Sequence, residues 1–431
     1  MQSVIFARNP VVVAAARSAL SCLALTCFLA ACSEGNRLTP IAAPPPPDPA
    51  PPPEPTFTTR ELLGEALFFD VNLSLNRTQA CATCHDPARA YTDNRLDAFG
   101  QPVAFSVGDD GFSQASRNAP TVTYAAFAPG FGSERHPRFN SQQPDYEGFV
   151  GGQFWDGRAE TLEDQAKNPP LGADEMAMPS KAAVIDRIRE NADYEASFEL
   201  VFGDTIFDNI EDAYDAMAAS IGAYERTDVF NTFDSKYDRS LTGDYVFFPG
   251  SKEALGRALF FSQQFTNCAT CHQLAPNGNR HETFTSYEYH NIGTPINEEA
   301  RLAANLPLDE LDPGLLANPK VDDPAQAGKY KVPTLRNVAV TAPYMNNGMF
   351  RSLDTVLRFY DHFQAGSENQ INPETGAPWR ESPFPDTVST TELEDGRPLS
   401  DNDIEALVCF MRSLTDQRFE DLLPDDGLRC D

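Results

Sequence analysis

Basic side chains are scarce in this sequence. Its 431 residues include 33 Lys and Arg against 63 Asp and Glu, so the formal net charge is −30. Proteins bind nucleic acid through clusters of Lys and Arg that neutralise its phosphates. The composition therefore excludes nucleic acid as a partner and favours a soluble, acidic surface that attracts basic molecules.

Long hydrophobic runs are missing as well. The most apolar stretch, residues 19–31, is shorter than the ~20 residues that a membrane-spanning helix requires. Arg8 and Arg17 precede it, and small residues at its end lead to Cys32. This order predicts a secretory signal peptide over residues 1–31, with Cys32 as the lipid-modified first residue of the mature protein. Cleavage without lipid attachment is the alternative. We expect a periplasmic protein that touches the membrane only through an N-terminal lipid anchor.

Residues 32–57 have the composition of a linker. Ten of the sixteen positions from 40 to 55 are Pro, which favours extended polyproline II over a packed core. The remaining length suffices for two domains of ~100–200 residues each. We expect the boundary where Asp, Ser, Gly and Pro accumulate, and we divide the body into residues 58–240 and 241–431.

Two segments of the body resemble each other. Residues 63–69 read Leu-Gly-Glu-Ala-Leu-Phe-Phe, and residues 255–261 read Leu-Gly-Arg-Ala-Leu-Phe-Phe. Each is followed after a short loop by Cys-Ala-Thr-Cys-His, at 81–85 and at 268–272. Self-similarity over this distance indicates two copies of one domain rather than a short-period repeat. The sequence thus predicts an internal duplication.

Helical periodicity dominates the body. Apolar residues recur at three- and four-residue steps from Ile210 to Tyr224 and from Ile404 to Leu414, whereas alternating strand patterns are scarce. Residues 129–152 are rich in Gly, Pro and polar residues and are expected to form a loop. The architecture is therefore expected to be mainly α. The expected N-caps are Thr58 (in a capping box with Glu61), Ser251, Ser352 and Ser400.

Both Cys-x-x-Cys-His motifs indicate a covalently attached c-type haem. Two thiols one helical turn apart can each add to a vinyl group of the porphyrin, and the adjacent His then ligates the iron. Zinc binding and a thioredoxin-like redox site are the alternatives, but the His after each pair and the lack of a βαβ pattern disfavour them. The residues expected to hold two haems are Cys81, Cys84 and His85 in the first half, and Cys268, Cys271 and His272 in the second.

The chain has few His residues that could serve as a second protein ligand to either haem iron. Besides His85 and His272 the chain has four His, and none lies between His85 and Asn118. An iron with two strong protein ligands carries electrons, whereas an open face can bind peroxide or oxygen. The first haem is therefore expected to be open, and His136 is the only reachable candidate for closing it from the N-terminal side.

From about residue 62 to residue 414 the chain resembles the bacterial di-haem cytochrome c peroxidases, and among them the MauG-type enzymes. The resemblance implies a mainly α fold of two tandem cytochrome c-like haem domains. Beyond the two haem motifs, it rests on Arg117-Asn-Ala-Pro120, Phe154-Trp-Asp-Gly-Arg158, Asp164-Gln-Ala166, Glu175-Met176, Val332-Pro-Thr-Leu-Arg-Asn337 and Pro343-Tyr-Met345.

The resemblance implies catalytic residues around the open face of the first haem. The family places a Gln and a Glu there, and the matching positions are Gln165 and Glu175. A carboxyl group can move a proton between the two peroxide oxygens, and an amide can orient the bound peroxide. Pro169 is expected to shape the same pocket. Trp155 is implied to lie between the two haems, where an indole can relay electrons; a core position is its plain alternative.

The second iron has competing distal ligands. MauG-type enzymes use a Tyr where other family members have a Met, and Tyr360 falls at that position. Met345 and Met349 are the competitors, and packing of Tyr360 on a helix face is the remaining alternative.

The family also holds a calcium ion between the haems. The matching oxygen donors are the Asn118 side chain and the carbonyls of Thr341 and Pro343. An ordinary loop Asn is the alternative for Asn118.

Two positions depart from the family pattern. Asn346 stands where the family commonly has a His after Pro-Tyr-Met, which puts any path through that imidazole in doubt. Gln101 stands sixteen residues after His85, where the usual peroxidases carry a His that caps the first haem. The first haem is therefore expected to be open in the resting state.

Cys409 and Cys430 remain after the haem motifs and the N-terminal cysteines are set aside. We expect them to form a disulfide, because the periplasm is oxidising. Free buried thiols are the alternative.

Three functions remain open. The leading one is a periplasmic peroxidase that reduces hydrogen peroxide at the first haem with electrons delivered through the second. The donor is expected to be a small redox protein, a c-type cytochrome or a cupredoxin, or else a protein or organic substrate. The second function is a MauG-like oxidase that uses peroxide or oxygen to modify a partner protein. The third is a di-haem electron carrier with both irons closed.

Overall fold

The computed structural model describes residues 55–431 except residues 98, 139–142 and 275–280. The predicted signal peptide, Cys32 and nearly all of the predicted linker lie outside the described residues. Contacts along the chain separate Met1–Pro51 from Pro52–Asp431, and the second unit contains everything that follows. Division of this unit at residue 240 stays a prediction. Among the described residues, no helix is both long enough and apolar enough to cross a membrane.

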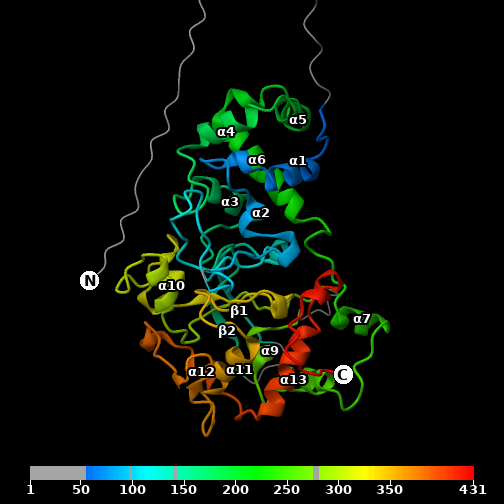
Figure 1. Cartoon of the computed structure of the whole chain (residues 1–431), viewed down its shortest axis with the longest axis vertical. Coiled ribbons are helices and arrows are strands. Elements are labelled where there is room, and N and C mark those ends of the chain that lie inside the picture. Colours follow the sequence, from blue (N-terminus) through cyan, green and yellow to red (C-terminus); the bar gives the residue numbers. More distant parts are fainter. Residues whose placement is uncertain (1–54, 98, 139–142, 275–280) are drawn as a thin grey trace, which may run out of the picture. The chain divides into compact units, whose positions relative to one another are not determined.

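Helices dominate the described part of the chain, which confirms the prediction of a mainly α fold. The α-helices are α1 Arg60–Phe68, α2 Cys81–Cys84, α3 Leu162–Ala166, α4 Lys181–Arg189, α5 Ala192–Phe202, α6 Ile210–Glu225, α7 Lys236–Thr242, α8 Lys252–Phe260, α9 Cys268–Cys271, α10 Glu298–Ala303, α11 Leu353–Asp361, α12 Thr390–Leu393 and α13 Asp401–Arg412. Figure 1 shows α1–α6 gathered in one region and α9 with α11–α13 in another.

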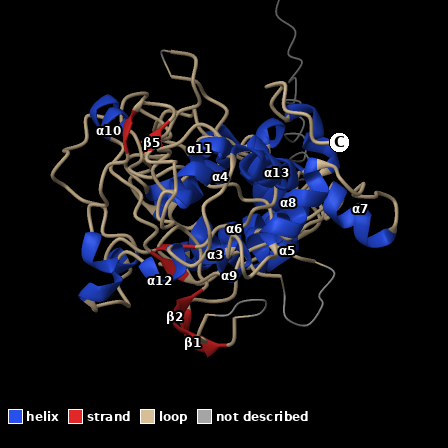
Figure 2. Cartoon of the chain, turned by 90° about the horizontal axis from the view of Figure 1, so that it is seen from below, coloured by secondary structure: helices blue, strands red, loops and turns tan. Residues whose placement is uncertain are grey.

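The strands are short and form two-stranded antiparallel sheets. Figure 2 shows how little of the ribbon they occupy. They pair as β1 Gly132–His136 with β2 Tyr146–Val150, β3 Tyr289–His290 with β4 Tyr330–Lys331, and β5 Ile371–Asn372 with β6 Ala377–Pro378.

Side-chain caps fix the helix starts close to where they are expected. Ser251, Ser352 and Ser400 each accept a hydrogen bond from a backbone N–H in the first turn of α8, α11 and α13. At α1 the prediction is wrong by one residue, because Thr59 and not Thr58 caps the helix. The two long apolar periodicities correspond to α6 and α13, which confirms them as helices.

Two helix crossings build the cores of the two regions. α1 crosses α6 where Gly64 faces Ser220, and α8 crosses α13 where Gly256 faces Ala406. A Cβ added at Gly64 would lie 1.9 Å from the Ser220 carbonyl oxygen, and one added at Gly256 would lie 1.8 Å from that of Ala406. Only Gly permits so close a backbone approach. The crossings thus explain the Gly in both Leu-Gly-x-Ala-Leu-Phe-Phe segments.

The segment expected to be a loop contains a β-hairpin. β1 pairs with β2 so that Gly132 lies opposite Val150 and His136 opposite Tyr146. The β1 sequence, Gly-Ser-Glu-Arg-His, is polar throughout and lacks the alternation that identifies a half-buried strand. The loop prediction for residues 129–152 is therefore wrong over both strands, which are held by cross-strand pairing and by contacts with the second half.

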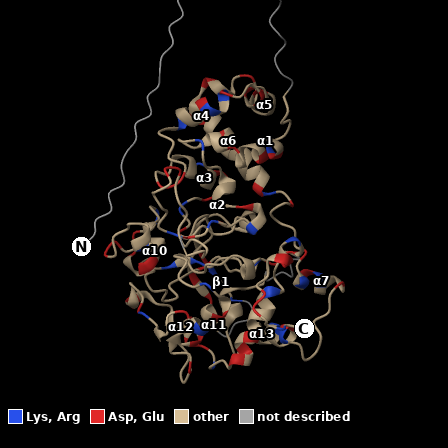
Figure 3. Ribbon diagram, in the orientation of Figure 1, with Lys and Arg blue, Asp and Glu red and all other residues tan. Residues whose placement is uncertain are grey.

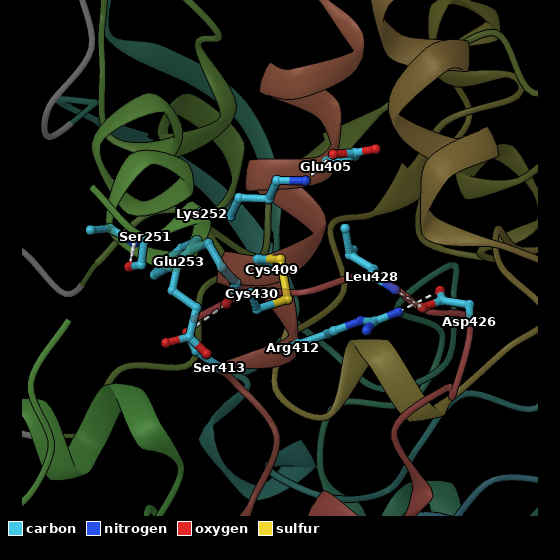
Figure 4. The surroundings of a disulfide bond; sticks show 12 residues. Ser251, Lys252, Glu253, Glu405, Cys409, Arg412, Ser413, Asp426, Leu428 and Cys430 are labelled. Carbon is cyan, nitrogen blue, oxygen red and sulfur yellow. Dashed lines mark hydrogen bonds and ion pairs between the residues drawn. A yellow bond between two sulfur atoms is a disulfide. The ribbon is translucent and has the colours of Figure 1, made fainter. Parts of the chain in front are cut away.

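A disulfide closes the C-terminal region. Cys409 in α13 bonds to Cys430, which confirms the predicted pair. Figure 4 shows Arg412, on the next turn of α13, paired with Asp426. The Glu253 amide of α8 donates to the Cys430 carbonyl oxygen at 3.2 Å. The C-terminal segment is thereby anchored to both α8 and α13.

Charged residues occur all along the ribbon (Figure 3), and Asp and Glu are more frequent than Lys and Arg. Arg117 is a charged residue that is largely buried, and it connects the two halves of the chain through ion pairs. Its guanidinium lies 2.7 Å from a carboxylate oxygen of Asp156 and 2.7 Å from one of Asp312. Asp156 is itself only 2 % exposed. This pairing accounts for Arg117 and Asp156 in the two sequence motifs that contain them, and Arg158 adds a second ion pair to Asp156 at 3.0 Å.

Candidate functional site

The first Cys-x-x-Cys-His motif forms α2 and the residue that follows it. Cys81 and Cys84 carry free thiols, and Cys81 packs against the core to which α6 contributes. The Nδ1 atom of His85 donates a hydrogen bond to the Tyr91 carbonyl oxygen at 3.2 Å. Because Nδ1 then carries the proton, Nε2 is the atom left to bind an iron.

The second motif repeats this arrangement in α9 and His272. Nδ1 of His272 donates to the Phe284 carbonyl oxygen at 2.9 Å. Burial lowers the pKa of His272 to about 4, so the imidazole is neutral, as a metal ligand must be. Tyr91 and Phe284 both have left-handed backbone, with φ of 56° and 53°. A residue with left-handed backbone thus supplies the acceptor for each imidazole, six residues after His85 and twelve residues after His272.

A large cavity lies beside the second motif. It encloses about 1570 Å³, including the part open to solvent, and Cys268, Cys271 and His272 are among the residues that line it. A cavity next to two free thiols and a neutral imidazole has the donor groups that a c-type haem requires. The lining includes many apolar side chains, such as those of Phe260, Ile292, Val332, Leu335, Leu357 and Leu407.

Two of the three candidate distal ligands face this cavity. Tyr360 of α11 and Met345 both line it, whereas Met349 is not among the lining residues. Burial raises the pKa of the Tyr360 phenol above its ordinary value. The phenol is therefore protonated at neutral pH unless a metal ion binds its oxygen.

A compact turn carries the residues expected over the first haem. Gln165 belongs to α3, and a short 3₁₀ turn over Pro169–Leu171 follows it. The Met176 amide donates to the Pro169 carbonyl oxygen at 3.2 Å, and the Glu175 amide donates to that of Gly172 at 3.1 Å. The chain therefore folds back on itself, which brings Glu175 next to the turn that begins at Pro169.

The Glu175 carboxyl is largely enclosed. A Cβ at Gly172 would lie 2.4 Å from Glu175 Oε2, so the carboxyl packs where a side chain at position 172 would collide with it. Burial raises the pKa of Glu175 to about 7, with a further increase from Asp174 and an opposing effect of Arg158. Met176, the next residue, belongs to the core against which Cys81 packs, so this turn lies on the side of the first motif.

Trp155 comes from the first half of the chain and lines the cavity of the second. Its indole Nε1 donates to the Asn118 carbonyl oxygen at 2.9 Å. Its own carbonyl oxygen accepts a hydrogen bond from the Lys331 amide of β4, also at 2.9 Å. The indole is therefore held by a segment of the first half, and the Trp155 backbone by a segment of the second.

The predicted calcium donors lie along two segments that are joined by a hydrogen bond. The Asn118 amide donates to the Asn346 carbonyl oxygen at 2.7 Å, and Asn118 Nδ2 donates to that of Ala104 at 3.1 Å. Within the described residues, no group donates to Asn118 Oδ1 or to the carbonyl oxygens of Thr341 and Pro343. Three oxygens without a donor suit a hard cation.

A buried charge cluster beside the second motif is not apparent from the sequence. Glu288 is fully buried and accepts from Nε2 of His290 at 2.8 Å, from Nε2 of His136 at 3.0 Å and from Arg138 at 3.2 Å. His290 lines the second cavity. His136 thus contacts the second site, so it is not placed to close the first iron. Glu288 and His290 lie 150 or more residues after His136 and Arg138, and no local pattern links the two pairs.

Sequence comparison assigns the chain to a family. The profile described as di-haem cytochrome c peroxidase matches residues 58–246. The methylamine utilization protein MauG of Paracoccus denitrificans is 48% identical over 365 residues, which cover 84% of this chain and 90% of that protein. The cytochrome c peroxidase Ccp of Escherichia coli is 32% identical over 315 residues, which cover 73% of this chain and 55% of that protein.

Solved structures agree. The diheme peroxidase BthA from Burkholderia thailandensis is 28% identical and superposes with a TM-score of 0.72, covering 86% of this chain and 89% of that one. A MauG-like protein associated with microbial copper homeostasis is 27% identical and superposes with a TM-score of 0.59. The match covers 92% of this chain and 99% of that one. Both haem motifs, the oriented imidazoles and these similarities lead to one conclusion. The chain belongs to the di-haem cytochrome c peroxidase family, whose members are oxidoreductases and include the MauG proteins.

Proposed function

We propose that this chain is a periplasmic peroxidase that reduces hydrogen peroxide to water at its first site with electrons delivered through its second. When bound, each c-type haem supplies an iron that exchanges single electrons, and the first also supplies the face to which peroxide binds. The residues that would hold the haems are Cys81, Cys84 and His85, and Cys268, Cys271 and His272.

The observation that carries the proposal is the enclosed Glu175 carboxyl, whose neighbour Met176 belongs to the core against which Cys81 packs. With a pKa of about 7, its carboxylate can accept a proton from the inner peroxide oxygen and return it to the outer one. The outer oxygen then leaves as water, a better leaving group than hydroxide. The Gln165 amide orients the peroxide by a hydrogen bond, and Pro169 narrows the pocket.

Trp155 is the proposed relay between the sites. Its indole is fixed at Nε1 and stands in the wall of the second cavity, so it needs no rearrangement to pass an electron. The donor is a small redox protein, a c-type cytochrome or a cupredoxin, that docks near the second haem. The formal charge of −30 would favour a basic donor.

Calcium is the proposed link between the two segments that carry Asn118, Thr341 and Pro343. A cation there would hold the first half against the 341–346 segment and so fix the geometry between the sites. The signal peptide and Cys32 would place the protein in the periplasm on a lipid anchor, with the Pro-rich segment as the spacer.

A MauG-like oxidase that modifies a partner protein is the second candidate. Tyr360 in the second cavity and the 48% identity to MauG favour it. A phenolate oxygen is a hard, anionic ligand that stabilises oxidised iron more than a Met thioether does. Such a second site would favour removal of electrons from a partner's side chain.

Rapid mixing of the haem-loaded protein with hydrogen peroxide tests the proposal. We expect a fast optical change, followed by steady oxidation of a reduced c-type cytochrome. Glu175→Gln is expected to slow the first step, whereas Glu211→Gln, an exposed acid paired with Lys181, serves as the control and leaves it unchanged. No fast change, or an unchanged rate in Glu175→Gln, contradicts the proposal. A fast change without donor oxidation favours the oxidase.

A further inference from the structure

We infer that Glu225 is a proton-binding group coupled to the oxidation state of the first haem. It binds a proton when that haem is reduced and releases one when it is oxidised. The inference requires a haem attached at Cys81 and Cys84, but no particular oxidant, donor or partner. It therefore goes beyond the proposed peroxidase function.

Glu225 occupies an unusual place for an acidic residue. It is the last residue of α6, where most acids would be solvated, yet it is only 4 % exposed. α6 crosses α1 and packs against α3, and its neighbour Tyr224 belongs to the core against which Cys81 packs. The end of this helix therefore carries Glu225 inward, toward the first Cys-x-x-Cys-His motif.

The Glu225 carboxyl has no hydrogen-bond donor on its buried oxygen. Oε2 is inaccessible to solvent and has no partner within the described residues. The cation next to it in sequence, Arg226, makes two hydrogen bonds to Glu163 of α3 at 2.6 and 2.9 Å, so its charge is already shared with another carboxylate. A buried carboxylate without a partner is costly, and burial raises the pKa of Glu225 to about 8. The Glu225 carboxyl is therefore expected to bind a proton near neutral pH.

Glu225 lies near the first haem site because its neighbour Tyr224 belongs to the core against which Cys81 packs. Burial raises the pKa of the Cys81 thiol most, and the negative charges of Glu225 and Glu175 raise it further, in keeping with that placement. In the haem-loaded protein this sulfur is bonded to the edge of the porphyrin, so a carboxyl close to it is close to the haem. The charged and titratable groups of the described residues that act on Glu225 are Arg226, which directly follows α6, Glu163 from α3 and Cys81 from α2.

The coupling follows from charge alone. A ferric haem carries one more positive charge than a ferrous haem, and a nearby positive charge lowers the pKa of a carboxyl group. Reduction therefore raises the pKa of Glu225. The balanced step is ferric haem plus one electron, Glu225 carboxylate and one proton, giving ferrous haem and Glu225 carboxylic acid. The electron comes from the donor of the enzyme or, in the experiment, from an electrode.

Spectroelectrochemical titration of the haem-loaded protein between about pH 6 and pH 10 tests the inference. The midpoint potential of the first haem is expected to fall with pH, with a limiting slope of about 59 mV per pH unit for one proton and one electron. Glu225→Gln keeps the shape of the neutral acid and is expected to abolish the slope. Glu211→Gln, at the exposed start of the same helix, is the matched control and is expected to retain it.

Two outcomes overturn the inference. One is a flat potential in the unsubstituted protein, and the other is a slope that persists in Glu225→Gln. If Glu175→Gln alone removes the slope, the proton belongs to Glu175 and the assignment is wrong. Should Glu225→Gln fail to bind haem, the redox-induced infrared difference spectrum of the unsubstituted protein decides: a protonated carboxyl band must appear on reduction. None of these measurements uses peroxide, so failure of the peroxidase proposal leaves them intact.

Discussion

Replacing Glu175 by Gln should change the activity and the stability of the protein in opposite directions. In the proposed reaction the carboxylate is the form that accepts the peroxide proton. A carboxyl with a pKa of about 7 is only about 1 % ionised at pH 5, so the peroxide reaction should run about 100-fold slower there than at pH 9. The Gln variant lacks this group and should be slower by about 10²- to 10⁴-fold, with a flat pH profile.

The effect of Glu175 on stability has the opposite sign. Its folded-state pKa is raised from 4.5 to about 7, so the carboxyl costs nothing below pH 4.5, where it is protonated in both states. Above pH 7 it is ionised in both states, and the shift makes the folded state less stable by about 3 kcal/mol at most. The free energy of unfolding of Glu175→Gln should therefore exceed that of the unsubstituted protein at pH 8 but not at pH 4.

Stopped-flow absorbance with peroxide measures the first effect, and guanidinium unfolding at the two pH values measures the second. Haem content and the resting spectrum control for disruption of the site. A pH-independent reaction in the unsubstituted protein refutes the assigned role. If the difference in the free energy of unfolding between Glu175→Gln and the unsubstituted protein does not grow from pH 4 to pH 8, the Glu175 carboxyl is not enclosed as the assigned role requires.

Four further perturbations have expected outcomes. Tyr360→Phe should change the EPR and optical signature of the second haem and raise its midpoint potential; an unaltered spectrum excludes Tyr360 as the ligand. Joint replacement of Cys409 and Cys430 by Ala, which opens a loop with a sequence separation of 21, should lower the free energy of unfolding by about 3 kcal/mol in guanidinium titrations while the spectrum of the haems stays the same. Arg117→Met leaves the buried Asp156 with Arg158 as its remaining ion-pair partner and takes the ion pair from Asp312, so it should cost at most about 3–5 kcal/mol, whereas Arg117→Met combined with Asp156→Leu should recover part of the loss. Chelation of calcium should slow electron transfer between the haems in rapid-mixing experiments, and calcium but not magnesium should restore it.

Local patterns account for the parts of the fold that the sequence predicts. The helices α6 and α13 follow from apolar spacing, and Ser251, Ser352 and Ser400 mark helix starts through a hydrogen bond made within one turn. The error at Thr59 has the same local origin, because two adjacent Thr offer the same hydroxyl. Where the determining contact is near in sequence, the residue types are enough.

Contacts between distant segments account for what the sequence does not predict. The hairpin strand β1 has no hydrophobic alternation, and it brings His136 to Glu288, more than 150 residues later. In the sequence nothing distinguishes Glu225 from the other Asp and Glu residues, which number 63 in all, because it is buried only by the crossing of α6 with its neighbours. Even the orientation of His272 depends on a carbonyl oxygen twelve residues away.

The cysteines and histidines of the site behave differently from its acids. Covalent attachment of haem requires a fixed spacing in sequence, so the motifs at His85 and His272 are visible before folding. Proton transfer requires only that a carboxyl be enclosed in the folded protein. For that reason the resemblance to a family, and not the residues alone, led to Glu175.

Trp155 has a consequence for how such a chain can evolve. The wall of the second cavity includes this indole, whose backbone belongs to the first half, and Glu288 of the second half binds two side chains from the hairpin of the first. A gene fragment encoding residues 241–431 alone would leave the cavity short of an aromatic wall and Glu288 without His136 and Arg138. An exchange of either part of the chain would therefore also have to replace the contacts that Trp155, His136 and Arg138 make across this boundary.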